Sequence, residues 1–138
     1  MKLAYPAIVT AAQEGGFIVQ FVDLAQAFSQ GETLEETLEN AEDVLSGVLE
    51  LKLELEQQVP LPSKPKKNQH VIAPRASVQS AVLFHLNRKG KTLSEIARTM
   101  NTGFAAVKRL ENPRHTLSLR QLEKAAQALG KKLILSLE

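Results

Sequence analysis

The first part of the chain contains two short, mainly apolar runs separated by a turn, the pattern of paired strands in a sheet. Leu3–Thr10 and Phe17–Val22 show this pattern and flank Ala11–Gly16, whose paired glycines permit the positive φ of a tight turn. The pattern predicts an antiparallel hairpin, with a third short strand over residues 27–29. The side chains expected in the core of the hairpin are Phe17, Val19 and Phe21.

A helical pattern follows, and Thr33-Leu34-Glu35-Glu36 has the form of a capping box at the start of the predicted helix. Apolar residues then recur at helical spacing, at Leu34, Leu38, Ala41, Leu45, Val48 and Leu49. Between Leu49 and Leu55 the leucines alternate as in a strand, but Leu, Glu and Lys favour helices and β-branched residues are missing. We therefore expect the helix to run to about Glu56, with acidic residues over its exposed side.

The prolines and lysines of residues 59–70 predict a connector, because proline fixes φ and removes a hydrogen-bond donor. Val71–Pro74 adds one more candidate strand to the first sheet, which places the domain boundary near Arg75. We expect a first domain over residues 1–74 and a second over residues 75–138. Both are small, so each buries a thin core and gains stability from self-association or a bound partner.

The second domain shows a helical pattern that ends in an apolar run. Four short helices are expected, at Ser77–Lys89, Thr92–Met100, Phe104–Glu111 and Leu119–Leu129. Gly130 is placed to end the last helix. The run that follows predicts a final strand, which would pair with the same strand of a second subunit. The residues expected in this dimer contact are Leu133, Ile134, Leu135 and Leu137.

Charge divides along the chain. Residues 1–59 carry two Lys, no Arg and eleven acidic residues, a net charge of −9, whereas residues 60–138 carry fifteen Lys and Arg against four Glu, a net charge of +11. The basic half suits a polyanion such as nucleic acid, and the acidic half suits a cationic protein partner.

The residue types exclude several classes of site. The chain has no Cys, so it lacks a disulfide framework, Cys-ligated zinc and a thiol nucleophile, which fits a cytoplasmic location. The three His are scattered and carboxylates do not converge from strands, so no catalytic residues, metal site or cofactor are expected. Pro6 argues against a signal peptide, and no apolar run reaches the length of a membrane span.

Thr92–Leu110 has the spacing of a helix-turn-helix. Ala97 is small enough to let two helices approach, and Asn101 lies where the sharp turn favours a left-handed conformation. The second helix would then enter the major groove of DNA. The expected contacts with bases or phosphates are Arg98, Thr102, Phe104, Ala105, Ala106, Lys108 and Arg109. A purely structural helical hairpin, with Phe104 over its core, is the alternative.

Two resemblances together cover nearly the whole chain. Residues 77–138 resemble the Cro and lambda-repressor class of helix-turn-helix domains, through Glu95–Arg98, Val107–Glu111 and Leu122–Gly130. The first half is similar to the HicB antitoxin family, through Glu14–Phe17, Phe21–Leu24, Gln30–Ala41 and Pro60–Ser63. The resemblances imply an α+β fold: an N-terminal partial ribonuclease H-like sheet with one helix and no activity, then a helix-turn-helix domain with a final strand.

The HicB resemblance implies an antitoxin of a type II toxin–antitoxin pair. Its first domain would neutralise a HicA-type mRNA interferase, and its second would repress the shared operon as a dimer or tetramer on operator DNA. We expect the toxin to meet carboxylates of the first helix, namely Glu35, Glu39, Glu42 and Asp43, although a merely solvated helix face has the same pattern. The rival interpretations are a ligand-responsive transcriptional regulator without a toxin partner, and an enzyme.

Overall fold

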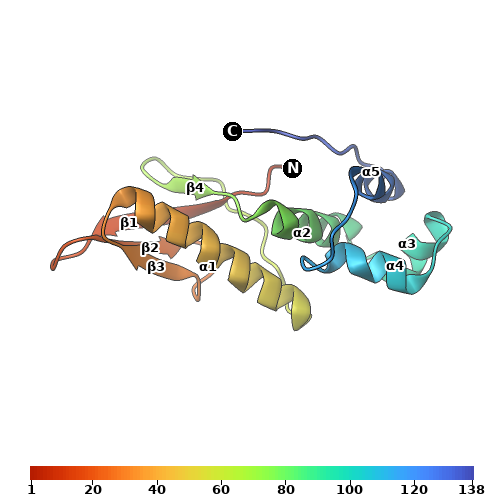
Figure 1. The fold of residues 1–138 in the computed structure, drawn as a ribbon, viewed down its shortest axis with the longest axis horizontal. Coiled ribbons are helices and arrows are strands. Elements are labelled where there is room, and N and C mark those ends of the chain that lie inside the picture. Colours follow the sequence, from red (N-terminus) through yellow and green to blue (C-terminus); the bar gives the residue numbers. More distant parts are fainter. The chain divides into compact units, whose positions relative to one another are not determined.

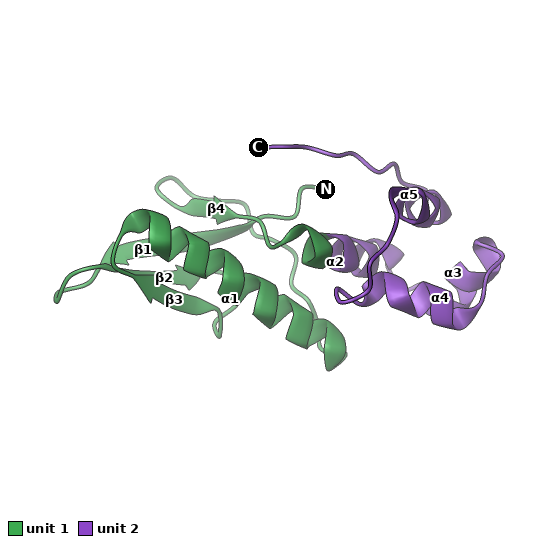
Figure 2. Cartoon of the chain, in the orientation of Figure 1, with its two compact units in different colours: residues 1–79 green, residues 80–138 purple.

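The structure, a computed structural model, describes residues 1–138. The chain divides into two compact units, Met1–Gln79 and Ser80–Glu138, coloured green and purple in Figure 2. We refer to them as the N-terminal unit and the C-terminal unit. The fold is α+β, as the resemblances imply, with one four-stranded antiparallel sheet and five α-helices.

The sheet belongs to the N-terminal unit and has the strand order β3-β2-β1-β4 (Figure 1). Its strands are β1 (Tyr5–Ala11), β2 (Phe17–Phe21), β3 (Phe28–Gly31) and β4 (His70–Ile72). β1 and β2 form the predicted hairpin, with Val9 opposite Val19. Gly15 and Gly16 both adopt positive φ in its turn. β4 comes from the candidate strand after the connector, and it pairs with the other side of β1.

One face of the sheet packs against α1 (Leu34–Glu54). Buried side chains meet there from both elements: Tyr5, Ala7, Val19 and Phe21 from the strands, and Ala41, Leu45 and Leu49 from the helix. Of the three hairpin residues expected in the core, Val19 and Phe21 are buried and Phe17 is partly buried. The period-two spacing of Phe17, Val19 and Phe21 therefore assigns the buried face of β2 correctly.

The start of α1 differs in one bond from the capping box that the sequence predicts. The Thr33 hydroxyl accepts from the Glu36 N–H at 3.1 Å, as expected, but the Glu36 carboxylate accepts from the Glu32 N–H at 3.4 Å and not from Thr33. At its other end α1 stops at Glu54, because Glu56 has a left-handed φ of 55° that ends a right-handed helix. The leucines near this end are helical and do not form a strand.

The first part of the connector packs onto the sheet. The Tyr5 hydroxyl donates to the Pro60 carbonyl at 2.8 Å, and burial, together with the nearby Asp23 charge, raises the pKa of Tyr5. The Ser63 N–H donates to the Asp23 carboxylate at 2.8 Å, and the Ser63 hydroxyl donates to the same carboxylate. These contacts give the proline-rich segment a defined path back to the edge of the sheet.

The C-terminal unit is helical. Its elements are α2 (Ala76–Arg88), which begins in the N-terminal unit, α3 (Leu93–Thr99), α4 (Phe104–Lys108), the 3-10 turn η1 (Arg109–Glu111) and α5 (Leu119–Ala128). They match the four expected helices, except that the third is divided into α4 and η1. Six buried residues form the core of the unit: Phe84, Ile96, Ala97, Val107, Leu110 and Ala125.

The final strand predicted for Leu133–Leu137 is absent from this chain. Residues 131–138, the C-terminal tail, have no regular secondary structure, and Ile134, Leu135 and Leu137 are 72%, 67% and 103% exposed. The prediction is wrong for the single chain because a strand needs a neighbour for its hydrogen bonds, and the C-terminal unit contains no other strand. The dimer contact assigned to Leu133, Ile134, Leu135 and Leu137 stays a prediction.

Candidate functional site

Four carboxylates lie along the exposed side of α1. We name Glu35, Glu39, Glu42 and Asp43 the acidic face; all four residues are exposed. Spacings of four and three residues place Glu35, Glu39 and Glu42 on neighbouring turns, and Asp43 lies four residues after Glu39, while Ala41 is buried. The structure therefore brings the predicted toxin-binding residues together on one element.

Asp43 differs from the rest of the acidic face because it has a cationic neighbour. The Arg75 guanidinium lies 3.6 Å from the Asp43 carboxylate and 3.9 Å from that of Glu50. Exposed ion pairs of this kind add little to stability, but the Arg75 charge reduces the negative potential around Asp43. Glu35, Glu39 and Glu42 therefore present the stronger part of the acidic face.

Arg75 is also attached to α1 through its backbone. Its N–H donates to the Ser46 hydroxyl oxygen at 2.9 Å, and that hydroxyl in turn donates to the Glu42 carbonyl at 2.8 Å. Ser46 is fully buried. Sequence reasoning missed this contact, and the only signal for it is a serine in the middle of a helix rich in Leu and Glu.

The turn between α3 and α4 has the backbone that the sequence predicts. Asn101 adopts a left-handed φ of 52°. Its N–H donates to the Arg98 carbonyl at 3.1 Å, and the Thr102 N–H donates to the Ala97 carbonyl at 2.9 Å. This pair of bonds closes α3 and reverses the chain after it. Gly103 then precedes the first residue of α4.

The residues predicted to contact DNA lie on and around these two short helices. Six of the seven are exposed: Arg98, Thr102, Phe104, Ala105, Lys108 and Arg109. Ala106 is partly buried, and Phe104 is 50% exposed, so neither of these side chains is fully presented to a ligand. Ile96 and Val107 form the buried contact between the helices, as expected. We name the six exposed residues the α3–α4 surface.

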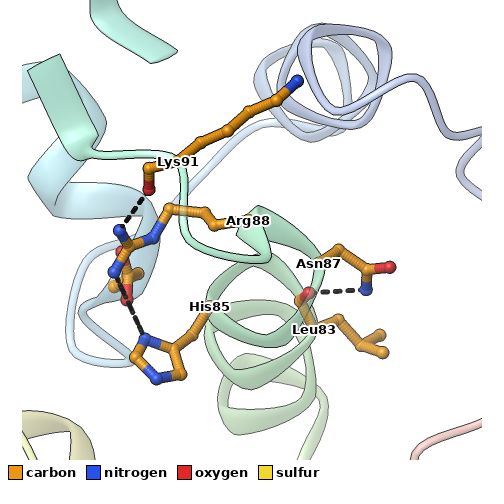
Figure 3. Close-up of polar contacts among 6 residues, drawn as sticks. Leu83, His85, Asn87, Arg88 and Lys91 are labelled. Atoms are coloured by element: carbon orange, nitrogen blue, oxygen red, sulfur yellow. Dashed lines mark hydrogen bonds and ion pairs between the residues drawn. The ribbon is translucent and has the colours of Figure 1, made fainter. Parts of the chain in front are cut away.

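A charged cluster holds η1 against α2 (Figure 3). Glu111 accepts from the Arg88 guanidinium at 3.1 Å, a second guanidinium nitrogen lies 2.8 Å from its other oxygen, and His85 Nδ1 lies 2.5 Å from the first oxygen. Arg88 also donates to the Lys91 carbonyl at 2.9 Å. Burial by itself raises the pKa of Glu111, but hydrogen bonds and positive charge from His85 and Arg88 outweigh it and lower that pKa.

This cluster was not predicted from the sequence, because Glu111 lies more than twenty residues after His85 and Arg88 and the three show no motif spacing. In addition, no three His, Asp or Glu side chains of the chain gather in a way that could hold a metal ion. None of its helices is both long enough and apolar enough to cross a membrane.

Comparison with known proteins relates both units to one class of protein. Residues 4–79 match the family described as "HicB_like antitoxin of bacterial toxin-antitoxin system". The chain is 38% identical over 136 residues to Antitoxin HicB of Escherichia coli (strain K12), an alignment that covers 96% of this chain and 98% of that protein. It is 32% identical over 138 residues to Antitoxin HicB 1 of Photorhabdus laumondii subsp. laumondii. That alignment covers 99% of this chain and 88% of that protein.

An acidic, helix-covered sheet joined to a basic helical unit, with relatives of this kind along almost the whole chain, defines an antitoxin of a bacterial toxin–antitoxin system. More narrowly, the chain belongs to the HicB-like antitoxin family. These relationships do not favour the rival interpretation of a ligand-responsive regulator without a toxin partner.

Proposed function

We propose that this antitoxin binds and inhibits a HicA-type mRNA interferase and represses its own operon by binding operator DNA as a helix-turn-helix protein. The observation that carries the proposal is the pairing of an exposed acidic face on α1 with an exposed, cationic α3–α4 surface in one member of an antitoxin family. The antitoxin acts by binding alone and has no catalytic activity of its own. The N-terminal unit is a partial ribonuclease H-like fold that serves as a docking domain.

The acidic face suits a toxin that acts on RNA. An mRNA interferase needs cationic residues to hold phosphates, and a row of carboxylates opposes that surface and excludes RNA from it. Glu35, Glu39 and Glu42 carry this role, because they are exposed and make no ion pair within the chain. Opposite charge also accelerates encounter, by about ten-fold to a thousand-fold for strongly charged pairs.

The toxin interaction is tested with a triple substitution, Glu35→Gln, Glu39→Gln and Glu42→Gln. We expect association with the purified toxin to slow by at least about ten-fold and to lose most of its dependence on ionic strength. The matched control is the triple substitution Glu14→Gln, Glu54→Gln and Glu56→Gln, which removes the same charge from exposed positions outside the acidic face. Equal association rates for the two variants would contradict the assignment, and stopped-flow mixing with toxin distinguishes the outcomes.

The α3–α4 surface suits duplex DNA. Lys108 and Arg109 follow one another at the end of α4, and Arg98 lies in the last turn of α3. Lys and Arg hold phosphates, and Arg also reads a guanine edge in the major groove. We propose that these three cations position the domain on the operator, with Thr102, Phe104 and Ala105 beside them.

The DNA interaction is tested with Lys108→Ala and Arg109→Ala. Each is expected to weaken binding to the promoter fragment, and loss of one phosphate contact lowers the slope of log affinity against log salt by about one. Lys64→Ala, an exposed cation of the N-terminal unit, is the control with the same change of charge. Unchanged retardation of the promoter fragment by both α4 variants would refute the assigned helix.

A further inference from the structure

The last turns of α1 carry a row of exposed apolar residues. Gly47, Leu51 and Leu55 follow one another at intervals of four residues, so they lie on one side of the helix. Leu51 is 51% exposed, and Leu55, the C-cap residue, is 56% exposed. In Figure 1 these last turns extend beyond β2 and β3. We name Gly47, Leu51 and Leu55 the apolar stripe.

Gly47 leaves an open depression in the apolar stripe. The residue is exposed, its φ is not positive, and a Cβ added there would meet no atom of the chain within 4 Å. Neither the backbone conformation nor the packing of the chain therefore requires a glycine, although glycine inside a helix lowers stability relative to alanine. A helical position without a side chain lets the backbone of a second helix come closer. Gly47 therefore suits a partner that packs closely against α1.

Carboxylates line one edge of the apolar stripe. Glu50 follows Gly47 by three residues and Glu54 follows Leu51 by three, a spacing that makes two residues neighbours on a helix surface. Asp43, a member of the acidic face, precedes Gly47 by four residues. The acidic face therefore continues along the edge of the stripe, and a partner that covers the stripe also meets negative charge.

The charge of this edge decides between possible partners. The Arg75 guanidinium lies 3.6 Å from the Asp43 carboxylate and 3.9 Å from that of Glu50, so the edge already holds one cation of the chain itself. The N-terminal unit has eleven acidic residues against six Lys and Arg, a net charge of −5. A second copy would bring carboxylates against carboxylates in a two-fold contact. A cationic partner instead places Lys or Arg beside the exposed Glu54.

We propose that the apolar stripe is the docking site for a cationic amphipathic helix of the toxin. The helix packs across Gly47, places its apolar residues against Leu51 and Leu55, and sets a Lys or Arg beside Glu54. This inference rests on the proposed function, because it takes the toxin as the partner. It adds to the acidic face a separate apolar contact that holds the complex together.

The acidic face and the apolar stripe act at different steps of binding. Charge attraction at long range mainly sets the association rate, whereas a contact buried in the complex mainly sets the dissociation rate. Leu51→Ala is therefore expected to make the full chain dissociate from purified toxin about ten-fold faster and to leave the association rate within about two-fold. Alanine favours the helix, so the variant stays folded. The control is Leu119→Ala, the same truncation at a residue of the C-terminal unit that is 57% exposed.

Gly47→Gln separates toxin binding from folding. Glutamine favours a helix more than glycine does and meets open space at this position, so the urea midpoint of unfolding is expected to rise. The same side chain fills the depression, so the toxin is expected to dissociate at least about ten-fold faster, with Gly47→Ala between the parent chain and Gly47→Gln. A purely structural role of Gly47 predicts instead that a more stable variant binds the toxin as the parent does.

Stopped-flow association and displacement of labelled toxin measure both rates on the full chain. Dissociation as slow as that of the parent in both Leu51→Ala and Gly47→Gln would overturn the docking site and leave the antitoxin function standing. A parent chain that does not bind the toxin would overturn the proposed function and this inference together. A lower mass of Leu51→Ala in sedimentation velocity, with toxin kinetics like those of the parent, would also overturn the docking site, because the stripe would then pair two copies of the chain.

Discussion

Glu111 joins two segments that are distant in the chain. Its carboxylate contacts both His85 and Arg88 of α2, and it immediately follows Leu110, which is buried in the core of the C-terminal unit. A partly buried carboxylate is stable there only because positive groups and hydrogen bonds surround it. Glu111 thereby fixes the position of the chain just after α4, where the proposed DNA contacts lie.

The lowered pKa of Glu111 predicts a pH dependence of stability. Because the folded-state pKa lies below the ordinary value of 4.5, the stabilisation is present above pH 4.5 and is lost as the pH falls through the folded-state pKa. Glu111→Gln is expected to lower the free energy of unfolding at neutral pH by about 1–3 kcal/mol and to flatten this acid dependence. Urea unfolding at several pH values measures both effects.

Glu123→Gln, at an exposed position of α5, is the control for this prediction. It removes the same charge without touching α2 or η1. If the control and Glu111→Gln gave the same unfolding curves at every pH, the cluster would have no role in stability.

The backbone conformation of a single residue was predictable where its cause lies in neighbouring residues. The left-handed Asn101 and Gly130 follow from turn chemistry within a few positions of the sequence, and both are confirmed by positive φ. The contacts of Glu111 and of Arg75 were not predicted, because their partners lie more than twenty residues away. The exposure of Phe104 was also undecided, since its residue type fits either a covered core or a ligand surface.

At the scale of elements, α1 approaches β3 closely at one point. Gly31, the last residue of β3, has no side chain, and a Cβ there would lie 2.7 Å from the N–H nitrogen and the hydroxyl oxygen of Thr37. Thr37 is fully buried and its hydroxyl donates to the Thr33 carbonyl at 2.7 Å. The glycine therefore sets the spacing between the strand and the first turns of the helix.

Gly31→Ala is expected to destabilise the protein by about 1–3 kcal/mol, because the added methyl group forces the helix away from the strand. Gly47→Ala is the matched control on α1, where a Cβ meets nothing within 4 Å. Replacing that helical glycine is expected to stabilise the protein by about 0.5–1 kcal/mol. The two substitutions are therefore expected to change the free energy of unfolding in opposite directions, which chemical denaturation measures. A stabilising Gly31→Ala would contradict the close packing of α1 against β3.

The elements that the sequence predicted well are those with a strong periodic pattern. The β1–β2 hairpin, α1 and the four helices of the second half all appear within a few residues of their expected bounds. The final strand at Leu133–Leu137 does not, because its pattern is apolar but this chain offers it no partner to pair with. An apolar pattern indicates that a segment is suited to burial but does not identify the surface that covers it.

At the scale of the whole molecule, the C-terminal tail carries three exposed aliphatic residues, Ile134, Leu135 and Leu137. We expect tail–tail pairing between subunits, because a strand formed there would cover Ile134, Leu135 and Leu137. Leu135→Asp is therefore predicted to reduce the mass of the parent chain about two-fold and to weaken operator binding, since two linked domains bind two half-sites together. Light scattering after size-exclusion chromatography, with a promoter-binding assay, tests both parts.

Leu119→Asp is the control for the tail, because Leu119 is 57% exposed and lies in the same unit but outside the tail. It is expected to keep the mass of the parent. If Leu135→Asp also kept that mass, the predicted role of the tail in dimerisation would be wrong. Toxin binding by the N-terminal unit is expected to be unaffected in either variant.

The strand order of the sheet has a consequence for synthesis on the ribosome. β4 pairs with β1 although about half of the chain separates them, so the sheet cannot close until residue 72 has emerged. Domains generally fold during translation from the N-terminal end. The acidic unit can thus be finished while much of the basic unit is still being translated. Under the function proposed above, a nascent antitoxin would then be able to capture its toxin before it is able to repress its operon.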